Sequence, residues 1–299
     1  MNRKFFAPAI MAAALLTAGG LPAAAAPATS TTVCSLRLGS VDATGGEVFQ
    51  QVAATRPPTI SSDGPTLPVF AAGQVRLSSS LVVKPGPVGP AVDSYVIIGS
   101  AMYHSTYRTG VDGRLDPKHP PVLTRIGGGW GTFTAFERSI RAGYTTYYGL
   151  RNDGMLFRWT SGADGVWHRA GSVPGFAGFK TMALISKTRT YDTFLMNTRA
   201  GALFTFHIPV GSPMHGMVKM VRERTWQGFE SLVAEKCGVY GTLLLGIDQD
   251  THAGYLYAVG HANGFATVIQ QIGKVPVPLT DHVYFRVVPS PAVDVLNGE

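Results

Sequence analysis

Five β-rich segments of this 299-residue chain end in the same pair, an aliphatic residue followed by an aromatic one. The pairs are Val48-Phe49, Met102-Tyr103, Leu156-Phe157, Leu203-Phe204 and Leu256-Tyr257. Their aromatic members are spaced by 54, 54, 47 and 53 residues. A unit that recurs about every 50 residues in a β-rich chain is typical of the blades of a β-propeller. The sequence therefore predicts an all-β fold built from repeated blades.

Each repeat has three parts, of which the first is an inner strand opened by a large apolar residue. Three such strands start at Trp130, Phe176 and Trp226. The second part is a hairpin, clearest from Tyr147 to Trp159, where apolar and polar residues alternate around the turn signal Asp153-Gly154. The third part is a closing strand with a short glycine signature, such as Arg169-Ala170-Gly171.

The two ends of the chain complement each other. The N-terminal copy, Leu36 to Val52, has a hairpin without a preceding inner strand, and the C-terminal copy, Asp281 to Val288, has an inner strand without a hairpin. Together they make one blade, so we expect five blades with the ring closed by strands from both termini. The second blade is irregular, and its inner strand is predicted from Val75 to Val83.

The N-terminus has the pattern of a secretion signal. Asn2-Arg3-Lys4 forms a basic region, the stretch from Phe5 to Leu21 is mostly apolar, and Ala24-x-Ala26 offers a small-residue cleavage site. The apolar run is short for a membrane span and no second run follows. We therefore predict a signal peptide over residues 1–26, a single propeller domain over 27–299, a secreted protein, and no transmembrane segment after signal removal.

Charge and composition argue against several classes of function. The formal net charge is +7, but the basic residues form no run, which indicates a solvated surface rather than a nucleic-acid interface. The eight histidines show no zinc-protease spacing, and no nucleophile motif accompanies them. We therefore expect no nucleic-acid partner, no metal, no cofactor and no catalytic residue.

The chain has two cysteines, Cys34 and Cys237. Export would place them in an oxidising compartment, where pairing is the default. Both fall at blade edges in the repeat, which favours a disulfide between them over two free buried thiols.

The best copy of the repeat, Gly149 to Trp159, resembles the repeat of the tachylectin-like propeller family. An aliphatic strand, an Asp-Gly turn and a Leu-Phe-Arg strand carry the resemblance, together with the Trp-x-x-Phe starts at Trp130 and Trp226. The resemblance implies a five-bladed propeller that binds amino sugars at shallow sites, one per blade, without catalysis. Unlike the blades of family lectins, the blades here differ in loop length and turn sequence.

The same copy supplies the candidate ligand site. Asn152 and Asp153 offer polar groups, and Trp159 and Trp167 offer aromatic faces on which a pyranose can stack. The alternative interpretation of Asn152 and Asp153 is turn chemistry, because Asn and Asp favour such backbone conformations. We interpret Trp130 and Trp226 as core residues, since they recur with Phe176 at strand starts.

Three classes of function remain open. The first is a lectin-like protein whose partner is a glycan or cell-surface saccharide. The second is a secreted module that binds another protein through its loops. The third, a glycoside hydrolase, needs two carboxyl groups about 5 to 10 Å apart. The acids expected near inner strands are Glu137, Glu230, Glu235 and Asp281, and they do not recur at one register.

Overall fold

The computed structural model describes residues 33–87 and 89–299, so the predicted signal peptide at 1–26 lies outside the described residues. Within these ranges the regular structure is 22 strands and one short 3-10 helix, η1 (Pro291–Val293). The prediction of an all-β chain is confirmed.

Three separate sheets each have four antiparallel strands in chain order. The first contains β10 (Phe133–Arg141), β11 (Tyr144–Arg151), β12 (Leu156–Ser161) and β13 (Trp167–Val173). The second contains β14 (Phe179–Lys187), β15 (Tyr191–Thr198), β16 (Leu203–Pro209) and β17 (Met217–Arg222). The third contains β18 (Ser231–Cys237), β19 (Gly241–Asp248), β20 (Ala253–Val259) and β21 (Ile269–Lys274).

The remaining strands form one larger sheet that joins the two ends of the chain. It contains β1 (Ser35–Val41), β2 (Gly46–Ala53), β3 (Thr59–Ser62), β4 (Leu67–Pro68), β5 (Val75–Ser78), β6 (Leu81–Lys84), β7 (Ala91–Ile98), β8 (Ala101–Arg108), β9 (Val122–Gly128) and β22 (Val283–Val288). Strand β22 pairs antiparallel with β1 and parallel with β6. The inner strand predicted from Val75 to Val83 is broken, because the buried pair Ser79-Ser80 separates β5 from β6.

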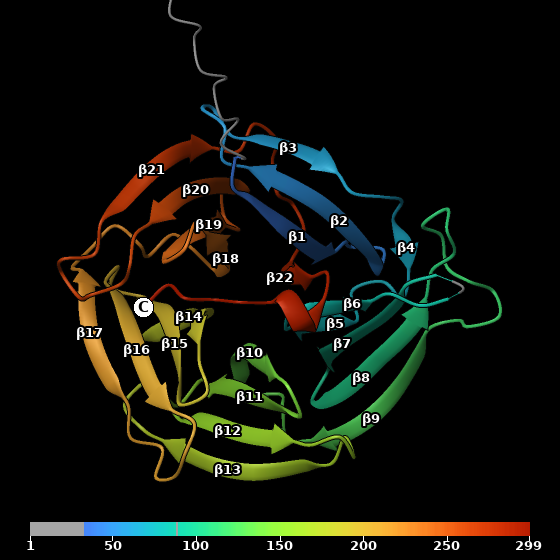
Figure 1. The fold of residues 1–299 in the computed structure, drawn as a ribbon, viewed down its shortest axis with the longest axis horizontal. Coiled ribbons are helices and arrows are strands. Elements are labelled where there is room, and N and C mark those ends of the chain that lie inside the picture. Colours follow the sequence, from blue (N-terminus) through green and yellow to red (C-terminus); the bar gives the residue numbers. More distant parts are fainter. Residues whose placement is uncertain (1–32, 88) are drawn as a thin grey trace, which may run out of the picture. The chain divides into compact units, whose positions relative to one another are not determined.

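The innermost strands lie around a common centre, with each sheet extending outward from it (Figure 1). Strand β10 lies beside β14, β14 beside β18, β18 beside β22, β22 beside β5, and β5 beside β10. Each neighbour relation links one sheet to the next and the last relation returns to the start. This radial arrangement of antiparallel sheets is that of a β-propeller.

A close approach between the first two strands of a sheet explains part of the sequence repeat. At Gly149 on β11, a Cβ atom would lie 2.7 Å from the Phe133 ring of β10, so no side chain fits there. Gly39 meets Phe285 and Gly246 meets Phe229 in the same way.

The outer neighbours of these glycines carry the repeated aromatics. Gly149 pairs with Phe157 and Gly39 with Phe49. Gly246 pairs with Tyr255, two residues before the aromatic of the repeated pair Leu256-Tyr257. The aliphatic–aromatic pairs lie in the second strand of each hairpin, at its start or inside it and not at its end.

The glycine signature of the closing strands corresponds to a β-bulge. In four sheets the register shifts by one residue, leaving Ile126, Ala170, Val221 and Ile272 without a direct partner. Gly171 and Gly273, which follow two of these residues, have φ values of 141° and 159°. A bulge increases the local twist of the strand, which suits the outer edge of a blade.

Buried polar groups connect neighbouring sheets. Asp192 on β15 is 0% exposed and accepts hydrogen bonds from the Arg141 guanidinium (2.6 Å), the Ser139 hydroxyl (2.7 Å) and the Tyr148 hydroxyl (2.7 Å), all of the preceding sheet. Arg158 on β12 donates to the carbonyl oxygen of Pro209 at 2.6 Å. Because hydrogen bonds to charged groups are among the stronger ones, such contacts fix the angle between sheets.

The C-terminal residues run from β22 across the centre of the ring (Figure 1). The backbone N–H of Gly298 donates to Ile185 at 2.9 Å, and the carbonyl of Gly298 accepts from Ala262 at 2.7 Å. Leu296, two residues before Gly298, is buried in the core. The segment thus links the sheet of β14–β17 to the sheet of β18–β21.

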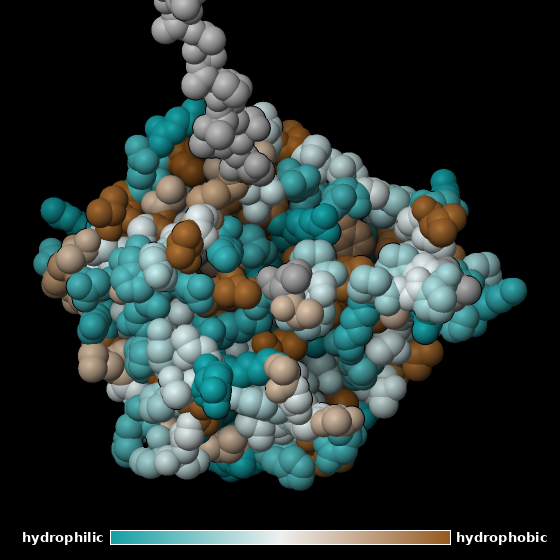
Figure 2. All heavy atoms as spheres, viewed as in Figure 1, coloured by the Kyte–Doolittle hydropathy of each residue, from teal (hydrophilic) through white to brown (hydrophobic). Residues whose placement is uncertain are grey.

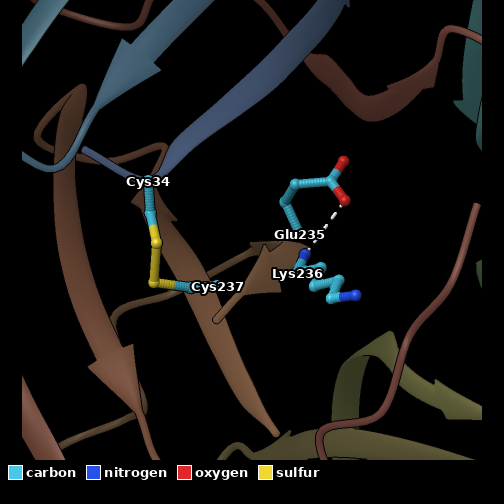
Figure 3. Close-up of a disulfide and its surroundings, with 4 residues drawn as sticks. All are labelled: Cys34, Glu235, Lys236 and Cys237. Carbon is cyan, nitrogen blue, oxygen red and sulfur yellow. Dashed lines mark hydrogen bonds between the residues drawn. A yellow bond between two sulfur atoms is a disulfide. The ribbon is translucent and has the colours of Figure 1, made fainter. Parts of the chain in front are cut away.

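The predicted disulfide between Cys34 and Cys237 is confirmed, with the two Cα atoms 5.5 Å apart (Figure 3). Cys34 directly precedes β1 and Cys237 is the last residue of β18. The bridge therefore fastens the start of the chain to the neighbouring sheet.

The face over which the C-terminal residues run is mostly polar, with apolar residues scattered between polar ones (Figure 2). In the described part of the chain, no helix has the length and apolar character needed to span a membrane.

We expect the disulfide to stabilise the fold by restricting the unfolded chain, because it closes a loop of 203 residues. The variant Cys34→Ser/Cys237→Ser should lose about 2–5 kcal/mol of unfolding free energy, measured by urea denaturation. Wild-type protein in reductant should fall to the same value and the double variant should not respond to reductant. Equal stability of the oxidised wild type and the variant would contradict this role.

Glu47 on β2 is 1% exposed and accepts a hydrogen bond from the Tyr107 hydroxyl of β8. Burial raises the pKa of Glu47 from its ordinary 4.5 to about 7, although the Tyr107 hydrogen bond opposes the shift. Between these two values the folded protein keeps a proton that the unfolded chain has released. The contribution of Glu47 to the free energy of unfolding is therefore largest below pH 4.5. It decreases as the pH rises toward 7 and is constant above that pH.

Glu47→Gln, which cannot ionise, should remove this loss and be more stable than wild type above pH 7 by up to about 3 kcal/mol. The measurement is the melting temperature of both proteins from pH 4.5 to 8. Glu137→Gln is a useful parallel variant, because the pKa of Glu137 is also raised to about 7. A constant difference between Glu47→Gln and wild type across this range would refute the prediction.

Candidate functional site

The structure places the four predicted site residues on one hairpin and its neighbouring strand. Trp159 lies in β12 and Trp167 is the first residue of β13, whereas Asn152 and Asp153 form the turn between β11 and β12. Both tryptophans are half-buried and both turn residues are exposed. The two tryptophan rings lie 6.2 Å apart between centroids.

The two tryptophans line a hollow of about 400 Å³ at the junction between the end of β9 and strands β12 and β13. Its lining consists of Ile126, Gly127, Gly128, Gly129, Trp130, Phe133, Arg151, Phe157, Trp159, Trp167 and Arg169. Five of these residues are aromatic and three are consecutive glycines. Asn152 and Asp153 are not part of the lining.

Aromatic packing holds the tryptophans in place. Trp159 lies 4.8 Å from the buried Trp130 ring and is stacked on Phe157 at 5.7 Å. Trp167 is stacked on the buried Tyr147 ring at 3.8 Å. Because one face of each indole is already supported, the rings are preorganised and lose little side-chain entropy on binding a ligand.

Two arginines of the hollow lie against the ring of Phe157. The guanidinium carbons of Arg151 and Arg169 lie 4.9 and 5.2 Å from the centre of the Phe157 ring. Such placement is a cation–π contact, which keeps a guanidinium flat against an aromatic ring. Arg169 reaches this position because it pairs with Trp159 across the β12–β13 ladder.

Asp153 acts on the hollow indirectly. Its carboxylate accepts from Arg151 Nε at 2.9 Å and from Nη2 at 2.5 Å, and also from the backbone N–H of Met155 at 3.1 Å. The Arg151 contact, followed by the backbone hydrogen bond, lowers the pKa of Asp153. Asp153 therefore shapes the turn, as the turn-chemistry interpretation predicts, and also orients a residue that lines the hollow.

Sequence reasoning missed Arg151, Arg169 and Phe157 as parts of the site. Phe157 was interpreted as the aromatic member of a repeated pair. Arg151 was interpreted as part of the hairpin and Arg169 as part of a glycine signature. A signal for Arg151 exists in the sequence, since it is two residues from Asp153 at the same turn. No local signal connects Arg169 with Trp159, because that contact depends on strand register.

The acids considered for hydrolysis are occupied by partners. Glu230 forms an ion pair with Lys180, and Asp281 accepts from the Ser40 hydroxyl at 2.6 Å. Glu235 lies 3.6 Å from the Arg286 guanidinium. The contacts of Glu230 and Glu235 connect neighbouring sheets, and that of Asp281 lies within the larger sheet.

Glu137 on β10 lines a central cavity of about 60 Å³, which has room for about two water molecules. Burial raises the pKa of Glu137 to about 7, while Arg286 and two backbone N–H groups oppose the shift. A cavity of this size does not admit a pyranose ring. Among residues 33–87 and 89–299, no group of three His, Cys, Asp or Glu residues is arranged to hold a metal ion.

Comparison of the sequence with protein-family models and with curated proteins finds no match. Comparison of the structure finds similar solved folds. One is the six-bladed β-propeller lectin of Aleuria aurantia, described with a fucose recognition mode, at 14% identity and TM-score 0.46, covering 81% of this chain and 78% of that chain.

A variant of AofleA from Arthrobotrys oligospora has 12% identity and TM-score 0.45, with coverage of 82% of this chain and 74% of that chain. The α-L-arabinofuranosidase PaAbf62A of Podospora anserina, solved with cellotriose, has 10% identity and TM-score 0.46, covering 75% of this chain and 86% of that chain. At these scores and identities the likeness carries no functional inference.

Trp130 and Trp159 should differ sharply when truncated. Trp130 is 5% exposed and packs against Phe133, Phe136 and Trp159, so Trp130→Ala should cost about 3–5 kcal/mol of unfolding free energy. Trp159→Ala should cost less, because part of that ring already faces solvent. Denaturant unfolding monitored by circular dichroism measures both. Equal losses would mean that Trp159 is a core residue.

Proposed function

We propose that this chain is a secreted β-propeller that binds carbohydrate and performs no catalysis. The observation that carries the proposal is the hollow lined by Trp130, Phe133, Phe157, Trp159 and Trp167 with arginine side chains beside them. Sugar sites typically combine an aromatic surface for the apolar face of a pyranose with a few polar groups that fix its orientation.

The proposed ring has five blades. Three blades correspond to the separate four-stranded sheets, and the larger sheet supplies two, one of β22-β1-β2-β3 and one built on β5 to β9. Strand β22 is the innermost strand of the first of these and comes from the C-terminal end of the chain. We also propose a relationship with tachylectin-like propellers, on the strength of the Gly149 to Trp159 hairpin.

Secretion is supported by the signal pattern at residues 1–26 and by the Cys34–Cys237 bridge. Disulfides persist in oxidising compartments and are rare in the cytosol. Binding partners would then be glycans or saccharides at a cell surface.

In the proposed site, Trp159 and Trp167 provide the stacking surface. Arg151, Asn152 and Asp153 provide hydrogen-bonding groups at one edge, where the β11–β12 turn meets the hollow. The site does not recur in the next two sheets. The residue pair at the position of Trp159 and Arg169 is Phe206 with Val218 in the sheet of β14–β17. In the sheet of β18–β21 it is Tyr257 with Gln271.

The purified protein should bind selected sugars on a glycan array, and the corresponding free sugar should compete. Trp159→Ala and Trp167→Ala should each weaken binding about tenfold, measured by titration calorimetry, because each removes one stacking face. Tyr240→Ala is the matched control, since Tyr240 is an exposed aromatic outside the hollow. If wild type binds no glycan, a protein-interaction module replaces this proposal.

A further inference from the structure

The described residues that line the hollow carry positive charge only. Among the described residues that line it, the charged ones are Arg151 and Arg169. A third arginine lies at the rim, because Arg125 Nη2 is 3.1 Å from the position that a Cβ atom on Gly128 would occupy. Among the described residues, the lining of this aromatic hollow thus has two arginines and no acid, and a third guanidinium lies close to Gly128.

The nearest carboxylate neutralises only part of this charge. The Asp153 carboxylate accepts hydrogen bonds from Nε and Nη2 of Arg151, so Nη1 of Arg151 has no contact with that carboxylate. Arg169 is exposed and donates only a 3.3 Å hydrogen bond, to the Ser172 hydroxyl, among its contacts in the described chain. A guanidinium carries five N–H donors, so Arg169 has most of its donors available.

We propose that the hollow selects an anionic saccharide, a pyranose that carries a carboxylate or a sulfate group. This inference rests on the proposed carbohydrate function and names the class of sugar. The ring of the saccharide stacks on Trp159, and its anionic group lies between Arg169 and the free edge of Arg151. The fork of donors on a guanidinium matches both carboxylate and sulfate geometry, so the anion is the shared feature.

Electrostatics favours the acidic sugar over a neutral one. A neutral pyranose would leave the excess positive charge of the hollow uncompensated, whereas an anionic group makes charge-assisted hydrogen bonds with it. Phe157 shields one side of both guanidinium groups from water, because both lie against its ring. Attraction at a partly desolvated site is stronger than at an open surface.

The test compares three probes by titration calorimetry at low salt: methyl β-D-glucuronide, methyl β-D-glucoside and glucose 6-sulfate. The glucuronide or the sulfate should bind at least about tenfold more tightly than the glucoside. Raising the salt concentration should reduce that advantage, because ions screen a partly exposed pair. Arg169→Ala should reduce the difference in binding affinity between the acidic probes and the neutral glucoside.

The matched control is Arg224→Ala, which removes an exposed arginine outside the hollow and should leave the difference unchanged. Melting temperatures of both variants check that the fold is intact. Tighter glucuronide binding identifies a carboxylate site, and tighter sulfate binding identifies a sulfate site. Equal binding of all three probes overturns the inference and leaves sugar binding standing. Binding of none of these probes overturns the inference, and loss of all glycan-array signal as well removes the proposed function.

Discussion

The fold depends on the hydrogen-bonded ladder between β1 and β22, which pairs Leu38 with Arg286 and Val41 with Val283. These strands come from opposite ends of the described chain, so the ring exists only when both ends are in place. Strand β22 also contacts β18 on one side and β5 on the other. The disulfide adds a covalent connection between the start of β1 and the end of β18, and the segment ending at Glu299 connects the sheets of β14–β17 and β18–β21 by hydrogen bonds. Pairing between strands so distant in the sequence costs loop-closure entropy before its contacts form, so a covalent connection beside the seam stabilises the ring.

Local signals in the sequence predicted those features that local physics determines. The Asp153-Gly154 turn and the hairpin around it were found, because turn chemistry is visible in a short stretch. The cysteine pairing was predicted from the oxidising compartment and from the position of both cysteines at blade edges. The prediction of one continuous inner strand from Val75 to Val83 was wrong. Nothing in the apolar pattern of this segment reveals that the buried pair Ser79-Ser80 interrupts the strand. In the last copy Gly246 pairs with Tyr255 and not with the repeated aromatic Tyr257, and the spacing of the repeat does not reveal this offset.

The candidate site shows the same division between local and non-local information. Trp159 and Trp167 were predicted as aromatic faces for a pyranose, and both line one hollow. Arg169 was not recognised, because its place beside Phe157 follows from pairing across β12 and β13 and from the bulge at Ala170. Without the bulge, side chains beyond it would alternate to the other face of the sheet. A one-residue irregularity in a closing strand therefore decides which charge reaches the hollow.

The aromatic packing around the hollow has an optical consequence. Three of the four tryptophans in the chain, Trp130, Trp159 and Trp167, have ring centroids between 4.8 and 6.2 Å apart. Indoles at such separations couple their electronic transitions and pass excitation energy to one another. Trp226, which packs against Phe229 and Tyr257, belongs to a different cluster. We therefore expect these three tryptophans to contribute strongly to the near-ultraviolet circular dichroism and the tryptophan emission, so that both signals change when a ligand enters the hollow.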